Sequence, residues 1–97
     1  MGRQEYDIKI TVNGRPINKV IIDSHYEEKH AKSVDDQVIL GLVKQLDGEF
    51  FEPDDVDENF SYFVTDKMVL GGKLYKLIWC LEDDKLYIGV INAYRRK

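Results

Sequence analysis

The stretch KLYKLIWCLEDDKLYIGVINAYRR, residues 73–96, predicts two paired strands at the centre of the C-terminal half of the chain. From Leu74 to Leu81 every residue except Lys76 is apolar. This pattern is typical of a central strand that a helix covers on one face and that is at least partly covered on the other. The following DKLYIGVINAYRR supplies its hairpin partner, in which Gly89 indicates either a bulge or a close approach of another backbone or a ligand.

The residues that precede this hairpin predict a third strand. FSYFVTD, residues 60–66, has the composition of a strand, and Gly71-Gly72 predicts the turn into the strand that contains Trp79. We therefore expect a meander of three antiparallel strands. Cys80, the single cysteine, lies inside the apolar run, which excludes an internal disulfide and predicts a buried, inert thiol.

The N-terminal sequence YDIKITVNGRPINKVIID, residues 6–23, predicts a β-hairpin. Asn13-Gly14 supplies a turn in which positive φ angles cost little, and a second arm from about Ile17 to Asp23 follows, rich in β-branched residues. Apolar residues alternate with polar ones along the first arm, as in a half-buried strand: Tyr6, Ile8, Ile10 and Val12.

A helix is predicted to follow. SVDD, residues 33–36, places Asp36 three residues after Ser33, which is an approximate capping box. Apolar residues then recur at helical spacing up to Asp47-Gly48, where the helix should end, and they form one stripe that must face a sheet or another helix. The stripe comprises Val34, Val38, Ile39, Leu42, Val43 and Leu46.

These elements predict an α+β fold: an N-terminal β-hairpin, one or two helices and a C-terminal three-stranded antiparallel meander. A length of 97 residues suits one hydrophobic core, so we expect residues 1–97 to form a single domain. The chain is 43% hydrophobic and 33% charged, a composition that favours folding over disorder. It has no apolar run of membrane-spanning length, and Met1 to Gln4 lacks the core of a secretion signal, which predicts a cytoplasmic protein with no membrane partner.

The charge of the chain is segregated. The net charge is −4, but residues 47–58, DGEFFEPDDVDE, hold seven of the eighteen acidic residues and no Lys or Arg. The rest of the chain therefore has a net charge of +3, concentrated in KHAK and the terminal YRRK. A basic surface opposite an acidic loop would follow, although solvated charges without a binding role explain the same pattern.

Both histidines lie in SHYEEKHAK, residues 24–32, between the second strand and the predicted helix. Ser24 is a candidate N-cap, so a short helix or turn that carries both histidines is expected. A zinc site is disfavoured because His25 and His30 are five residues apart rather than four and the one cysteine lies in the core. We predict no metal and no cofactor.

The layout of the chain resembles the small bacterial ribonuclease superfamily that joins barnase, EndoU, the colicin tRNases and RelE-type toxins. In this layout a histidine-bearing segment is followed by a helix and then by a sheet, and the last hairpin of the sheet ends in an aromatic residue and arginines. SHYEEKHAKSVDDQVILGLV followed by KLYKLIWCLEDDKLYIGVINAYRR looks like its RelE-like branch, in which a His-containing helix precedes a hairpin ending in Thr or Asn, Tyr and Arg. The resemblance covers Asp23 to Arg96. It implies a metal-independent endoribonuclease of toxin type, with RNA or the ribosome as target and an antitoxin protein as partner.

The chemistry of such cleavage selects the catalytic candidates. Metal-independent RNA cleavage needs a base that takes the proton of the 2′-hydroxyl, an acid that protonates the 5′-oxygen and cations that stabilise the phosphorane. The pKa of histidine suits the first two roles. On a regular helix a spacing of five residues turns His25 and His30 roughly 140° apart, so only one of them can point squarely into a pocket. We favour His30, because Lys29 and Lys32 adjoin it and can hold phosphate, and rank His25 second.

The end of the last strand supplies the rest of this predicted site. Tyr94 and Arg95 join the catalytic set, while Asn92 and Arg96 are predicted to bind a base or a phosphate. Side chains alternate along a strand, which puts Asn92 and Tyr94 on one face and Arg95 on the other.

A second class of function fits the same residues: a non-catalytic protein-interaction module that binds its partner through the edge of the sheet. The histidines and the terminal RRK would then be solvated surface groups. A histidine beside Tyr94 and Arg95 in a cleft favours the ribonuclease, whereas histidines on a flat surface favour the module.

Overall fold

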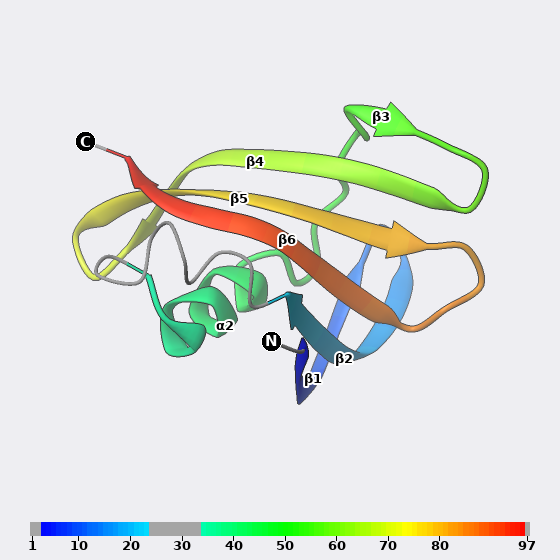
Figure 1. The fold of residues 1–97 in the computed structure, drawn as a ribbon, viewed down its shortest axis with the longest axis horizontal. Helices are drawn as coiled ribbons and strands as arrows, with labels where there is room; N and C mark the ends of the chain where they lie inside the picture. The colour runs from blue at the N-terminus through cyan, green and yellow to red at the C-terminus, as the bar shows by residue number, and fades with distance from the viewer. Residues whose placement is uncertain (1–2, 24–33, 97) are drawn as a thin grey trace.

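The computed structural model describes residues 3–23 and 34–96, which form one strongly twisted β-sheet and a helix that packs on one of its faces (Figure 1). The sheet order is β1-β2-β6-β5-β4-β3, and every neighbouring pair is antiparallel except β2 and β6. The elements are β1 (Arg3–Val12), β2 (Arg15–Asp23), α2 (Asp36–Lys44), β3 (Asp55–Val56), β4 (Phe60–Leu70), β5 (Lys73–Glu82) and β6 (Tyr87–Arg96).

The predicted α+β class, with a hairpin set apart from a three-stranded meander, is wrong, because the fold is mostly β. The described part of the chain contains six strands in one mixed sheet and a single helix. A parallel pairing of β2 with β6, from Lys19 opposite Tyr87 to Ile22 opposite Val90, merges the N-terminal strands with the C-terminal ones. This pairing joins opposite ends of the chain, so no local periodicity in the sequence could reveal it.

The N-terminal hairpin turns where the sequence predicts it. Asn13 and Gly14 have φ angles of 53° and 74°, and Val12 lies opposite Arg15. The Asn13 side chain also makes two hydrogen bonds to the loop after α2. Its Nδ2 donates to the Phe51 carbonyl at 3.1 Å, and its Oδ1 accepts from the Phe51 amide at 2.6 Å. The turn therefore positions a loop from elsewhere in the chain.

The N-cap of helix α2 lies two residues after the predicted one. Asp35 is the N-cap, and its carboxylate accepts from the Val38 amide at 2.9 Å, so the capping box predicted from Ser33 and Asp36 is wrong. The Asp36 carboxylate instead accepts a hydrogen bond from the Tyr6 hydroxyl of β1. The predicted apolar stripe is buried except for Val38, which is half-buried.

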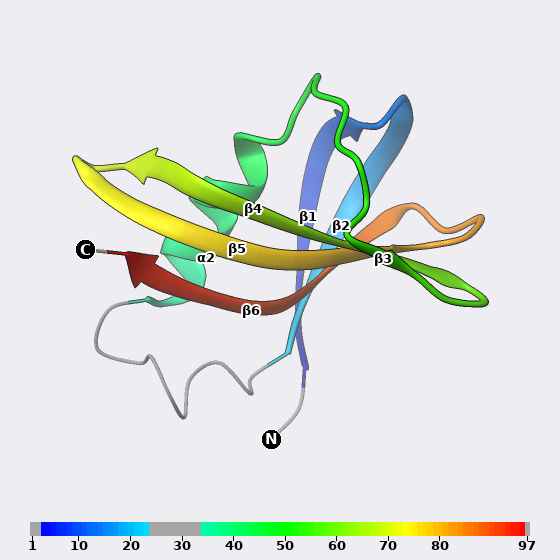
Figure 2. The same ribbon diagram turned by 90° about the horizontal axis from the view of Figure 1, so that it is seen from above.

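The core lies between α2, the β1–β2 hairpin and one face of β4, β5 and β6, as the view from above shows (Figure 2). At its centre the Trp79 indole is fully buried, stacked on Phe63 at 4.1 Å between ring centroids and met edge-on by Phe51 at 5.4 Å. The indole N–H donates to the Thr65 hydroxyl at 2.9 Å. The one polar group of this buried ring is thereby satisfied.

The short helix or turn predicted for residues 24–32 lies outside the described residues. No helix among those described is long and apolar enough to cross a membrane.

Candidate functional site

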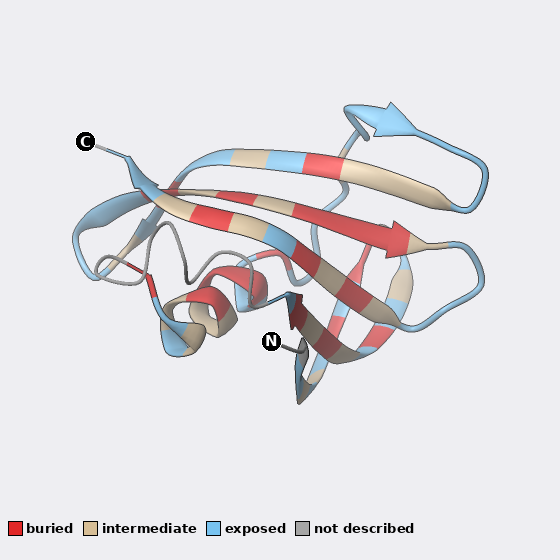
Figure 3. Ribbon diagram, viewed as in Figure 1, coloured by how far each residue is buried: buried red, intermediate tan, exposed pale blue. Residues whose placement is uncertain are grey.

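The second face of the C-terminal strands points away from α2, and we call it the open face. Along β5, Tyr75, Leu77 and Trp79 belong to the core, while the alternating Ile78 and Cys80 point to the other side. Figure 3 shows this as bands of different burial along β5 and β6. In the described part of the chain no helix packs on the open face.

A β-bulge at Ile91 sets which residues of β6 reach the open face. Trp79 lies opposite Val90 and Ile78 lies opposite Asn92, so Ile91 is the extra residue. Before the bulge Gly89 is on the open face, and after it Asn92 is. The alternative that placed a bulge at Gly89 itself is excluded, because Gly89 pairs in register with Cys80.

Apolar and aromatic side chains run across this face as a strip. Val64 and Ile91 are 40% and 37% exposed, which is high for such residues in the middle of a sheet. The rings of Phe60 and Tyr62 stack with centroids 6.0 Å apart. The open-face strip, as we call it, comprises Phe60, Tyr62, Val64, Ile78, Ile91 and Tyr94.

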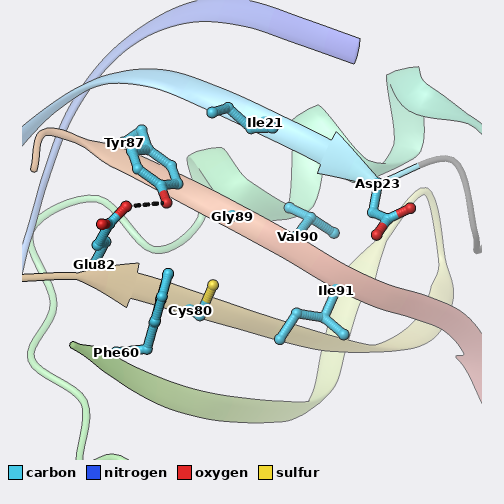
Figure 4. A pocket seen from close by; sticks show the side chains of 9 residues that line it. All are labelled: Ile21, Asp23, Phe60, Cys80, Glu82, Tyr87, Gly89, Val90 and Ile91. Atoms are coloured by element: carbon cyan, nitrogen blue, oxygen red, sulfur yellow. Dashed lines mark hydrogen bonds between the residues drawn. The ribbon is translucent and has the colours of Figure 1, made fainter. Parts of the chain in front are cut away.

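A hollow of about 250 Å³ opens at one end of the strip, above Gly89 (Figure 4). The absence of a side chain at Gly89 creates its floor, because a Cβ there would come within 2.9 Å of the Cys80 sulfur and 3.6 Å of the Tyr87 ring. Close approach of neighbouring groups, rather than a positive φ, is thus the reason for glycine. The hollow is lined by Ile21, Asp23, Phe60, Cys80, Glu82, Tyr87, Gly89, Val90 and Ile91.

Acidic side chains stand at two ends of the hollow. The Tyr87 hydroxyl donates to Glu82 Oε1 at 2.6 Å and holds this carboxylate at one end of the hollow, and Asp23 lies at the opposite end. The lining, all of it within the described residues, includes no Lys or Arg. The hollow therefore combines an apolar floor with an acidic residue at each end.

Another carboxylate of the open face interacts with a tyrosine on β4. The Tyr62 hydroxyl donates to Asp57 Oδ2 at 3.1 Å. The pKa of the Tyr62 phenol is raised, first by desolvation and then by the hydrogen bond and negative charge of Asp57. Tyr62 thus stays neutral to higher pH than an ordinary tyrosine.

The opposite end of the open face is basic. Lys76 Nζ lies 5.7 Å from the centroid of the Tyr94 ring, and Arg96 Nε is 3.4 Å from an Asp66 carboxylate oxygen. Asn92 Oδ1 accepts from the Ala93 amide at 2.9 Å. The open face therefore runs from acidic at the β5–β6 turn to basic at the C-terminal end of β6.

The structure separates the predicted ribonuclease residues into three groups. Asn92, Tyr94 and Arg96 share the open face, opposite Ile78, Lys76 and Leu74 of β5. Arg95 pairs with the buried Tyr75 on the helix-facing side and is exposed at the strand end. The remaining candidates, His25, His30, Lys29 and Lys32, lie outside the described residues.

The residues around the hollow were not predicted as a site. Gly89 was the only signal of it in the sequence, since a glycine in an otherwise apolar strand indicates a close approach. Cys80, predicted as a buried thiol, is indeed only 8% exposed, but it faces the hollow rather than the core.

Within the residues that the structure describes, no group of three or more His, Cys, Asp or Glu side chains is arranged to hold a metal ion. Comparison of the chain with protein families, curated proteins and solved structures gave no match.

Proposed function

We propose that this protein is a non-catalytic interaction module that binds a polypeptide segment across the open face of β4, β5 and β6. The observation that carries the proposal is the open-face strip, an aromatic and apolar surface that the core does not use. Apolar surface of this kind is costly to leave in water and typically marks a binding site. We expect this binding to take place in the cytoplasm.

The charges around the strip favour a protein over a nucleic acid as the partner. A nucleic acid strand that followed the open face would pass Glu82 and Asp57, and both repel phosphate. A polypeptide can match an acidic end and a basic end at once. Aromatic rings with polar groups at their margins, such as Tyr62 and Tyr94, are typical of protein-binding surfaces.

A peptide-display selection on the immobilised full chain tests the proposal, with a Val64→Glu variant for counter-selection. Val64 is exposed and outside the core cluster, so the variant should fold with little change in stability. We expect enriched peptides to bind the wild type and to lose at least about tenfold in affinity for the variant, the size of about 1.4 kcal/mol. Peptides that bind both proteins equally would contradict the proposal, and so would a selection without enrichment.

A metal-independent ribonuclease of RelE-like type is the second candidate. The observation in its favour is the grouping of Asn92, Tyr94 and Arg96 on one face, with Lys76 beside the Tyr94 ring. Such a cluster can stack on a base and contact a phosphate. A toxin of this kind would also have an antitoxin partner.

RNA cleavage in the presence of EDTA tests this second candidate. A histidine-driven reaction uses the 2′-hydroxyl of the substrate and leaves a 2′,3′-cyclic phosphate. His30→Ala should lower the rate by roughly 10²-fold or more, and His25→Ala by less. Intact RNA after long incubation, both free and on translating ribosomes, would reject the candidate.

A further inference from the structure

We propose that the hollow above Gly89 binds an arginine side chain of the partner polypeptide. The inference rests on the proposed function and specifies its chemistry. An anchor that fits must be apolar along its length and positively charged at its tip, because the floor is apolar and the ends are acidic. Arginine and lysine are the two residues whose side chains combine an apolar stem with a positively charged tip.

The aromatic walls favour arginine over lysine. Phe60 and Glu82 are directly opposite each other on β4 and β5, and the Tyr87 hydroxyl holds the same carboxylate from β6. A guanidinium group can stack on an aromatic ring while it donates two parallel hydrogen bonds to a carboxylate. An ammonium group lacks the planar surface for the first contact.

The Glu82 carboxylate has enough acceptor positions to bind a guanidinium group as well as the Tyr87 hydroxyl. A carboxylate has about four acceptor positions on its two oxygens, and the Tyr87 hydroxyl uses one of them. The Tyr87 bond also fixes the side chain before the ligand arrives, which lowers the entropy cost of binding. At about 250 Å³ the hollow has the volume of roughly eight water molecules, enough for one long side chain.

A second copy of this chain is the competing occupant, since the basic end of one open face could meet the acidic end of another. Arg96 is already paired with Asp66, and the Lys76 ammonium lies near the Tyr94 ring. Both cations would have to leave these contacts, so a separate basic segment is favoured. Self-association is retained as an outcome of the test.

Four blocked pentapeptides that differ only at their central residue test the inference on the full chain: Leu-Ala-X-Tyr-Ala with arginine, citrulline, norleucine or glutamate as X. Binding is followed through the backbone amide signals in NMR titrations. We expect the arginine peptide to shift the amides of Gly89, Cys80 and Glu82 and to bind at least about tenfold more tightly than the citrulline peptide, which has the same shape without the charge.

A matched pair of variants tests whether the Glu82 carboxylate is the group that binds the arginine. Glu82→Gln should weaken the arginine peptide about tenfold and leave the citrulline peptide unchanged. The carbonyl of residue 82 that accepts from Arg15 at 2.8 Å is retained in this variant, so the contact between the hairpin and the β5–β6 turn persists. Glu58→Gln, at an exposed carboxylate outside the hollow, should change neither affinity.

The outcomes separate this inference from the proposed function. Equal shifts across the open face with all four peptides would overturn the arginine assignment and leave the interaction module standing. No open-face shift with any peptide at millimolar concentration would overturn both. Open-face shifts that depend on protein concentration without peptide would assign the face to a second copy and reject a basic partner.

Discussion

The two faces of β5 contrast within a single strand. Trp79, on the covered face, is stacked on Phe63, touched edge-on by Phe51 and hydrogen-bonded to Thr65. Ile78, its neighbour in sequence, points to the open face and is outside the core cluster. Both residues belong to the same apolar run of the sequence, so hydrophobicity alone does not show which face of the strand is covered.

The apolar content of a sheet face and its coverage by other elements are separate properties. An antiparallel sheet can leave one face to water, and that face is usually polar. Here the open face keeps an aromatic and apolar strip between an acidic and a basic end. We attribute the covered face to folding stability and the open face to binding, and the predictions below test this division.

The largest effect is expected at Trp79. Trp79→Ala should lower the free energy of unfolding by about 3 to 5 kcal/mol, the usual cost of removing a buried aromatic side chain. Ile78→Ala, one residue away on the open face, should cost about 1 kcal/mol or less. Urea unfolding of both variants measures the difference, and similar costs would mean that the open face is packed as tightly as the core.

An intermediate effect is expected at the floor of the hollow. Gly89→Ala should destabilise the fold by about 1 to 3 kcal/mol, because the new Cβ would meet the Cys80 sulfur at 2.9 Å. Adding Cys80→Ala removes that sulfur, so the double variant should regain most of the loss. The stability losses of the two single variants would simply add if the contact were not the cause.

The smallest effect is a pH dependence at Tyr62. Because the folded protein raises the pKa of this phenol, it favours the neutral form, and the associated stability is fully present below the ordinary tyrosine pKa of about 10. This stability is lost as the pH rises through the higher pKa of the folded state. The stability advantage over Tyr62→Phe should therefore shrink above about pH 10 in denaturant titrations, and an advantage that stays constant to pH 11.5 would refute the assignment.

Local sequence signals predicted much of the secondary structure. The Asn13-Gly14 turn and the burial of the apolar stripe from Val34 to Leu46 each depend on a few neighbouring residues, and both predictions are confirmed. The cap of α2 was misplaced because Ser33 and Asp35 both have the chemistry of an N-cap and propensity does not rank them.

Long-range pairings could not be predicted. The parallel contact of β2 with β6 changes the fold class, although each of these strands alone has an ordinary apolar pattern. The bulge at Ile91 likewise follows from pairing with β5, and it decides that Asn92 and Tyr94 reach the open face. The hollow needs β2, β4, β5 and β6 together, so only Gly89 hinted at it.

The solvent exposure of side-chain methyl groups shows whether the second face of β4, β5 and β6 is open to a partner. With a soluble paramagnetic agent in an NMR experiment on the full chain, we expect strong broadening for the methyls of Val64, Ile78 and Ile91 and protection for those of Leu77 and Ile88. Adding the arginine peptide should then protect the first set and leave the second unchanged. Methyls of Val64, Ile78 and Ile91 that are already protected in the free, monomeric protein would contradict the claim that this face is open for a partner.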